Sequence, residues 1–174
     1  MYKRQLVSTF KGHASLLRAV AVTRDGHHII RGSDDGLVKV WNVATKSLVS
    51  TCRGHTDPIC TVAAMADGLR IISGSADQNI RVWTLDGTLE NTFSELHTGT
   101  VKAVVALPDN QHALSGSADE TIKLFNVKNG AVLRRFTHHT YQVLSLALLP
   151  DGLRFVSGSA DTTARIYEHG LAPQ

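Results

Sequence analysis

The sequence predicts an all-β fold made of four copies of one module. Four series of residues recur at a constant interval of 42 positions, and no series slips. Apolar residues fall in short runs between turn residues, and no run follows a helical period. A chain of 174 residues that is 43% hydrophobic and 19% charged is long enough to bury a core and lies outside the disordered class. The recurring residues are His13, His55, His97 and His139; Trp41, Trp83, Phe125 and Tyr167; Asp25, Asp67, Asp109 and Asp151; and Asp35, Asp77, Asp119 and Asp161.

Each module is expected to contain four short strands, and the first module shows the pattern. An apolar run at 17–22 is followed by the turn RDG, in which Asp and Gly favour a tight reversal. A second run, HHIIRGS, ends in another turn, and the third run, LVKVW, alternates apolar and polar residues as a half-buried strand does. A weaker fourth run, LVSTC, precedes the next imidazole. Four antiparallel strands in about 42 residues are typical of one blade of a β-propeller.

Short motifs at the ends of the modules identify a family. The pairs Gly12-His13 and Gly54-His55, the SGSAD segments and the closing VKVW and IRVW resemble the WD-repeat propeller family, and the resemblance extends from Leu6 to Tyr167. It implies one domain at 1–174 with four four-stranded antiparallel blades, repeats at about 13–54, 55–96, 97–138 and 139–174, and an additional outer strand at 5–11. The departures are Leu96 and His138 in place of Gly, Phe125 and Tyr167 in place of Trp, and Asn42, Thr84, Asn126 and Glu168 in place of Asp.

The resemblance assigns the recurring polar residues to architecture. In the family, the His, a strand hydroxyl, the turn Asp and the Trp form a buried hydrogen-bonded chain, and such a chain satisfies every buried polar group. The favoured hydroxyls are Ser73, Ser115 and Ser157, with Ser33, Ser75, Ser117 and Ser159 as the alternative. Arg31 occupies the favoured position in the first module, so that network is expected to be incomplete, and Phe125 shortens the third. The assigned residues are His13, Asp35, Trp41, His55, Ser73, Asp77, Trp83, His97, Ser115, Asp119, His139, Ser157 and Asp161.

No catalytic residue, metal or cofactor is expected. The sequence contains no GxSxG, Walker, GxGxxG or HExxH motif. An enzyme needs one site, whereas four copies of a His, Ser and Asp set indicate architecture. The adjacent pairs His27-His28 and His138-His139 place their side chains on opposite faces of a strand, which does not suit chelation of one ion. An enzyme built on a propeller frame is the alternative, and a cluster of carboxylates or a metal would favour it.

The resemblance also implies a partner surface around the central channel. This surface is lined by the residues three and five positions after each His and by the residue before each turn Asp. Its apolar and basic side chains are expected to accept an acidic or mixed peptide. The alternative is that these residues are only solvent-exposed and bind no partner. The predicted function is a non-enzymatic scaffold for other proteins or peptides, with an architectural subunit of a large complex as the alternative. The residues assigned to this face are Leu16, Arg18, Asp34, Lys102, Tyr141, Gln142 and Leu144.

Charge, hydrophobicity and cysteine content indicate which classes of partner and which cellular compartment to expect. Lys and Arg outnumber Asp and Glu by 18 to 15, and charges of both signs are scattered, so a nucleic-acid partner is not expected. No apolar run reaches the roughly 20 residues that span a bilayer, so a membrane partner is not expected either. Cys52 and Cys60 match neither a zinc pair nor a redox pair. We interpret them as free thiols in a reducing compartment, the cytoplasm or the nucleus.

Closure of the ring is the remaining question, because the family usually closes rings of about seven blades and bare sheet edges invite pairing. The outer strand at 5–11 precedes the first module, and the last module shows only three strands between 139 and 167. The N-terminal strand is therefore expected to complete the last blade. It does so either within one chain, in a tight four-bladed ring, or between two chains, in an eight-bladed homodimer, which is the favoured arrangement. A third possibility is a segment of a longer propeller.

Overall fold

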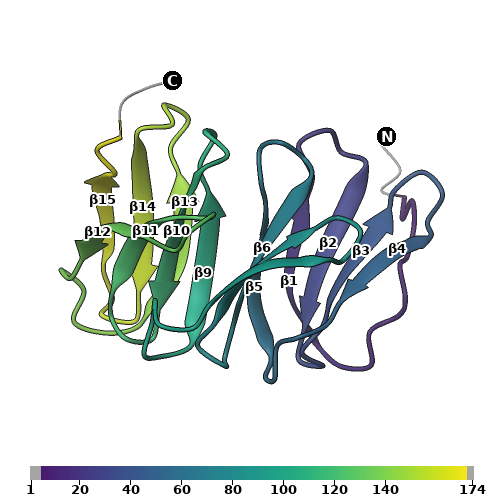
Figure 1. Cartoon of the computed structure of the whole chain (residues 1–174), viewed down its shortest axis with the longest axis horizontal. Coiled ribbons are helices and arrows are strands. Elements are labelled where there is room, and N and C mark those ends of the chain that lie inside the picture. Colours follow the sequence, from purple (N-terminus) through teal and green to yellow (C-terminus); the bar gives the residue numbers. More distant parts are fainter. Residues whose placement is uncertain (1–4, 172–174) are drawn as a thin grey trace.

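The structure, a computed structural model, describes residues 5–171, so the outermost residues of the expected domain at 1–174 lie outside its described part. The described residues form fifteen strands and no helix, and the strands form four antiparallel sheets that stand side by side in a row (Figure 1). We call these sheets blades 1 to 4 in chain order. The predicted all-β propeller architecture with four repeated units is confirmed.

Each blade is a meander whose strands neighbour one another in chain order. The prediction of four strands per blade holds for blades 1 to 3, whereas blade 4 has three strands among the described residues. Blade 1 contains β1 (Leu17–Val22), β2 (His28–Ser33), β3 (Val38–Asn42) and β4 (Leu48–Cys52). Blade 2 contains β5 (Ile59–Ala64), β6 (Arg70–Ser75), β7 (Ile80–Thr84) and β8 (Leu89–Phe93). Blade 3 contains β9 (Val101–Ala106), β10 (His112–Ser117), β11 (Ile122–Asn126) and β12 (Val132–Phe136), and blade 4 contains β13 (Val143–Leu148), β14 (Arg154–Ser159) and β15 (Ala164–Glu168).

The strand register repeats with the sequence period. The middle strands of the four blades pair at positions that are 42 residues apart from one blade to the next, which explains why the sequence series do not slip. The turn after the first strand is closed by its aspartate, as in blade 2, where the backbone N–H of Leu69 donates to Asp67 Oδ1 at 2.8 Å. The equivalent central pairs are Ile30 with Val40, Ile72 with Val82, Leu114 with Leu124, and Val156 with Ile166.

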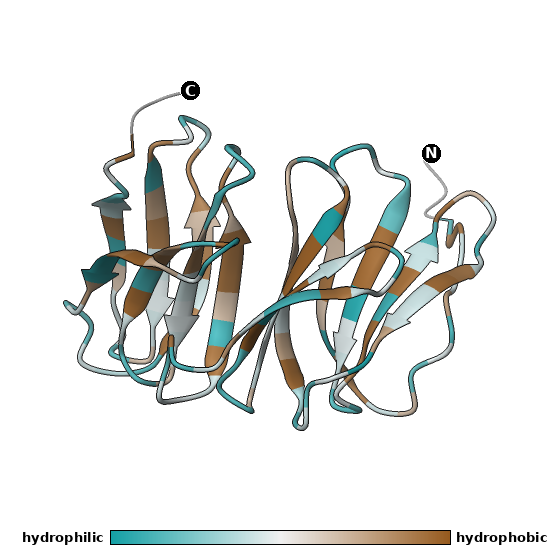
Figure 2. Cartoon of the chain, viewed as in Figure 1, coloured by the Kyte–Doolittle hydropathy of each residue, from teal (hydrophilic) through white to brown (hydrophobic). Residues whose placement is uncertain are grey.

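The hydrophobic core lies between the blades and not inside any one of them. Three buried clusters fill the three junctions, and Figure 2 shows the hydrophobic bands along the strands. In the first junction, Ile30 and Val40 of blade 1 pack with Ile59, Ile71 and Trp83 of blade 2. A blade is a single layer with two apolar faces, so it is stable only when each face is covered. The modules therefore stack face to face, so that each blade covers a face of the next.

The expected outer strand at 5–11 is not formed in this chain. Residues 5–13 adopt no regular structure, and Phe10, Gly12 and His13 of this segment contact blade 1. The Arg31 Nη1 donates to the Phe10 carbonyl oxygen at 2.8 Å, and the Phe10 ring packs edge-on against Trp41 with 6.0 Å between centroids. β15 lies at the opposite end of the row (Figure 1), so the segment does not pair with the edge that it was expected to complete. The predicted alternative of a tight four-bladed ring within one chain is therefore wrong.

Candidate functional site

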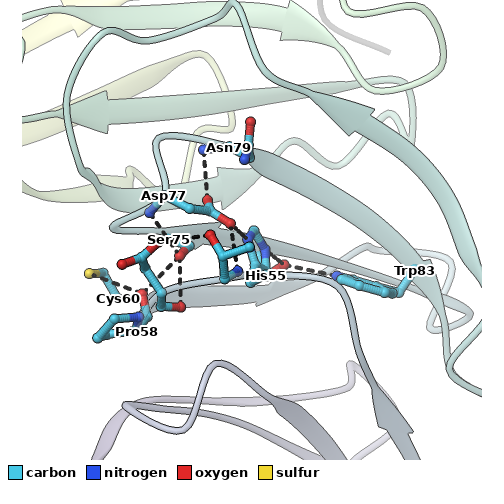
Figure 3. A network of polar contacts seen from close by, with 10 residues as sticks. His55, Pro58, Cys60, Ser75, Asp77, Asn79 and Trp83 are labelled. Atoms are coloured by element: carbon cyan, nitrogen blue, oxygen red, sulfur yellow. Dashed lines mark hydrogen bonds and ion pairs between the residues drawn. The ribbon is translucent and has the colours of Figure 1, made fainter.

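A chain of buried hydrogen bonds joins four parts of blade 2 (Figure 3). His55 Nδ1 donates to Asp77 Oδ2 at 2.7 Å, and His55 Nε2 accepts from Ser73 Oγ at 2.8 Å. Ser73 Oγ accepts in turn from the indole Nε1 of Trp83 at 2.8 Å. The backbone N–H of Asn79 also donates to Asp77 at 2.9 Å. These contacts tie the loop before β5 to β6, to β7 and to the turn between them.

The two contacts of the histidine recur in blades 3 and 4, where Phe125 and Tyr167 do not supply the indole contact, and they show which serines take part. In blade 2 the alternative serine, Ser75, points elsewhere: its hydroxyl donates to the Pro58 carbonyl at 2.9 Å and accepts from the Asp77 N–H at 3.1 Å. Ser75 therefore closes the turn, and the favoured set binds the imidazoles. The recurring contacts are His97 with Asp119 and with Ser115, both at 2.8 Å, and His139 with Asp161 and with Ser157, both at 2.6 Å.

Blade 1 has a different arrangement because Arg31 stands where the other blades have serine. His13 Nδ1 still contacts Asp35 Oδ2 at 2.9 Å. Arg31 lies over the Trp41 ring, 4.8 Å from its centroid, and donates to Phe10. His13 Nε2 and Trp41 Nε1 are buried without a hydrogen-bond partner within residues 5–171. The network of blade 1 thus stops at its histidine.

The charge states of the blade 2 network follow from its burial. Burial lowers the pKa of His55, so its imidazole is neutral and donates from one nitrogen only. Burial alone raises the pKa of Asp77, but the hydrogen bonds from Asn79 and His55 outweigh it and hold that pKa below the ordinary value. Ser73 is completely buried, as are Ser115 and Ser157. These hydroxyls are therefore not accessible from solvent.

One end of the four blades carries the residues assigned to the partner face. In each blade, the backbone N–H of the residue before the turn Asp donates to the carbonyl three residues after the His. This bond brings both positions to the same end of every blade and repeats with little variation. The four bonds run from Asp34 to Leu16 at 2.9 Å, from Ala76 to Pro58 at 3.0 Å, from Ala118 to Thr100 at 2.9 Å, and from Ala160 to Gln142 at 2.9 Å.

The side chains of this face are apolar at its two ends and basic at its middle. Leu16 of blade 1 and the blade 4 residues Tyr141 and Leu144 are exposed, whereas Lys102 of blade 3 and Gln142 are half-buried. Lys102 has no ion-pair partner among the described residues. The face therefore offers apolar anchors around one unpaired cation.

Arg18 differs from the expectation that it accepts an acidic peptide. Its guanidinium donates to both carboxylate oxygens of Asp34, at 2.6 Å and 2.9 Å. The hydrogen bond and the charge of Asp34 raise the pKa of Arg18, and the same hydrogen bond lowers the pKa of Asp34. The two residues are 16 positions apart, and the strand register that joins them is not evident from their spacing. The pair is close to neutral as a unit, which leaves Lys102 to attract an acidic group.

Sequence reasoning did not single out the outer faces of the first and last blades. Leu17, Val20 and Val22 of β1 and Ile166 of β15 are exposed, although their counterparts in the other blades are mostly buried. The sequence does carry a signal for these faces, a series of glycines at the same 42-residue interval. The series consists of Gly32, Gly74, Gly116 and Gly158, one in each blade. Within residues 5–171, no group of three or more His, Cys, Asp or Glu is placed to hold a metal ion. None of the described residues forms a helix that is long and apolar enough to cross a membrane.

Comparison with protein-family models gives matches to the WD domain, G-beta repeat, at residues 4–42, 46–84, 87–126 and 130–168. This chain belongs to the WD-repeat family. The matched units of this WD-repeat protein begin near the outer strand, whereas the repeats expected from the histidines begin one strand later. Both divisions give four units, and they differ in which strand starts a unit.

Curated relatives match this WD-repeat chain over one module. The ribosome biogenesis protein BOP1 homolog of Drosophila grimshawi is 47% identical over 36 residues, which is 21% of this chain and 5% of that protein. The homolog of Drosophila melanogaster is 44% identical over 36 residues, with the same shares. This chain thus covers only a small part of those relatives. Among solved structures, the computationally designed Ika4 protein superposes with a TM-score of 0.81 at 26% identity, covering 95% of this chain and 99% of that one.

Proposed function

We propose that this WD-repeat chain is a non-enzymatic scaffold that binds a protein or peptide at the end of the blades described above. One observation carries the proposal: Leu16, Tyr141 and Leu144 are 69%, 55% and 48% exposed, and the repeated backbone bonds hold Leu16 itself and Gln142, which lies next to Tyr141 and close to Leu144 in the chain. Large apolar and aromatic side chains on a rigid frame lose little conformational entropy on binding, and such residues dominate protein interfaces.

The charges on this face indicate the kind of peptide. Arg18 is neutralised by Asp34, so the unpaired cation of the face is Lys102. An apolar anchor of the partner packs against Tyr141 and Leu144, and an acidic group of the partner lies opposite Lys102. The proposed ligand class is therefore a mixed apolar and acidic peptide, and not a highly acidic one.

A labelled peptide panel tests the proposal. Peptides that combine one large apolar residue with one or two acidic residues are titrated against the purified chain, and Kd is measured by fluorescence anisotropy. Leu144→Ala is expected to raise Kd about tenfold, since truncation of an interface anchor costs roughly 1 to 2 kcal/mol. Leu69→Ala is the matched control, because Leu69 is 66% exposed in the turn at the other end of blade 2. Equal Kd values for both variants contradict the assigned face.

An architectural subunit of a larger assembly is the second candidate. The short match to proteins named for ribosome biogenesis favours it, although that match covers one module only. Cross-linked capture from cells separates the candidates, because a single stoichiometric assembly supports the architectural role and several substoichiometric clients support the scaffold. An enzymatic role has less support, because the repeated serines are completely buried.

A second copy of this chain is the other partner that we propose, in a homodimer of eight blades. The exposed apolar faces of blade 1 and blade 4 support it. We also place the protein in a reducing compartment, the cytoplasm or the nucleus. Cys52 and Cys60 are free, and burial raises the pKa of Cys52 to about 12, which leaves that thiol unreactive.

A further inference from the structure

Every junction between neighbouring blades is built around a glycine of the second strand. An ideal Cβ at Gly32, Gly74 or Gly116 would lie no more than 2.6 Å from a side chain of the next blade, which is closer than real Cβ atoms approach. The side chain that fills each space is the first residue of the next blade's inner strand. We call this space the glycine slot and its occupant the knob; the three knobs are Ile59, Val101 and Val143, and all are completely buried.

In the single chain, no knob fills the fourth slot, and the fourth knob fills no slot. Gly158 stands at the same register in β14, but a Cβ there would meet only Ser145 Oγ of its own blade, at 2.7 Å, and Gly158 is half-buried where the other three glycines are buried. The corresponding knob is Leu17, the first residue of β1, which is 52% exposed. One chain therefore carries an open slot at one end and an unused knob at the other.

The rest of the two faces matches in the same way. On blade 1, Val20 is exposed where its counterparts in blades 2 and 3 are buried. On blade 4, Ile166 is 64% exposed where its counterparts are completely buried. Both faces are apolar, and both repeat the chemistry of the internal junctions. The buried counterparts are Val62 and Val104 for Val20, and Val40, Val82 and Leu124 for Ile166.

The N-terminal segment shows where an outer strand belongs. Phe136 ends the outer strand of blade 3 and packs against Tyr167 of blade 4, with 5.1 Å between ring centroids. Phe10 packs in the same way against Trp41 of blade 1. Phe10 thus occupies the place that the last residue of a preceding blade's outer strand takes. Residues 5–9 precede Phe10 in the chain and so lead into the place where a blade stacked on blade 1 would need its fourth strand.

We infer that a second copy of this chain supplies that preceding blade, with Leu17 of each copy seated in the Gly158 slot of the other. Residues 6–10 of each copy then pair with β15 of the other and complete blade 4. The register follows from β3 and β4, in which Val40 pairs with Ser50 and Trp41 with Leu48. The same register 42 residues apart places Ser8 opposite Ile166 and Leu6 opposite Tyr167. This inference rests on the proposed homodimer and names the contacts that form it.

The occupant is a second copy because both halves of the junction are present on one chain. Blades 1 and 4 lie at opposite ends of the row (Figure 1), so the chain does not close on itself. Two copies related by a two-fold axis make two identical junctions and leave neither apolar face exposed. They also leave no unpaired edge at β15, which is the feature that sheet proteins avoid.

Light scattering on the purified chain of 174 residues tests the inference. The wild-type mass is expected to be twice 18.8 kDa at micromolar concentration. Leu17→Asp removes the knob and Gly158→Val fills the slot, so each is expected to give the mass of one chain while the circular dichroism spectrum stays that of a β protein. Leu69→Asp, an equally drastic change outside the junction, is expected to stay dimeric.

The outcomes separate two failures. A wild-type mass of one chain overturns the homodimer and the junction together, and a series of higher masses overturns ring closure. A dimer that survives both Leu17→Asp and Gly158→Val overturns the junction alone. The binding face for peptides lies at the ends of the strands, so its failure in the peptide titration leaves these masses unchanged.

A cysteine pair tests the register. Ser8→Cys combined with Ile166→Cys is expected to give a covalent dimer on a non-reducing gel, because directly opposed strand residues lie within the range that a disulfide spans. Val7→Cys with Ile166→Cys is the matched control: a shift of one residue turns the side chain to the other face. The wild-type chain, with Cys52 and Cys60, controls for background oxidation. Equal cross-linking of both pairs overturns the proposed register.

Discussion

Arg31 lies over the ring of Trp41, 4.8 Å from its centroid, at the position where Ser73 binds Trp83 in the next blade. The substitution leaves the indole nitrogen of Trp41 without a partner within the described residues. It also holds the Phe10 carbonyl. Blade 1 therefore lacks the hydrogen bond to its indole and has instead a hydrogen bond from Arg31 to the N-terminal segment.

Arg31→Ser is expected to raise the free energy of unfolding by about 1 kcal/mol, because a hydroxyl satisfies both His13 Nε2 and Trp41 Nε1. The measurement is urea denaturation followed by circular dichroism. Arg31→Ala is the control, since it removes the guanidinium without supplying a hydroxyl. A serine variant that is no more stable than the alanine variant would show that the network does not re-form.

Asp77→Ala is expected to lower the free energy of unfolding by roughly 1 to 3 kcal/mol, because His55 and the Asn79 N–H lose a buried acceptor. Asp57→Ala is the matched control in the neighbouring loop, where the carboxylate is exposed and, among residues 5–171, binds only the hydroxyl of Thr56. Chemical denaturation measures both. An unchanged midpoint for Asp77→Ala would remove the structural role of the network.

The thermal midpoint is expected to fall as the pH drops below about 6.5. Burial lowers the pKa of His55 from 6.5, so the unfolded chain binds a proton that the folded chain excludes. The contribution of His55 is complete above pH 6.5 and is lost below it. Differential scanning fluorimetry between pH 8 and pH 5 measures this loss, and the range avoids titration of the carboxylates. His55→Gln should flatten the profile, and an unchanged slope in that variant argues against a buried neutral imidazole.

Gly74→Ala is expected to lower the free energy of unfolding by about 1 to 3 kcal/mol, because the new Cβ overlaps the Val101 side chain in a filled slot. Gly158→Ala is the control when both changes are made in the Leu17→Asp chain, where the fourth slot stays empty. There it should change stability by less than about 0.5 kcal/mol. Similar losses at both glycines would contradict the difference between a filled and an empty slot.

The sequence alone determined the blades. The 42-residue series, the turn aspartates and the alternation in the third strand are local signals, and each depends on hydrogen bonds or packing within one module. They were sufficient for the four units, for the family and for the missing serine at Arg31. For the hydroxyl, the sequence favoured Ser73 but left Ser75 as the alternative, because both hydroxyls lie on one face of a strand, two residues apart.

The tertiary structure decided what depends on contacts between distant strands. It chose Ser73 as the partner of His55, and it paired Arg18 with Asp34, because strand register sets which side chains meet. It also left residues 5–13 without a strand, since a strand forms only where another edge offers hydrogen bonds. The open slot at Gly158 arises for the same reason. The sequence of a module indicates that its faces pack against neighbouring blades, but only the stacking of the blades shows which face has no neighbour.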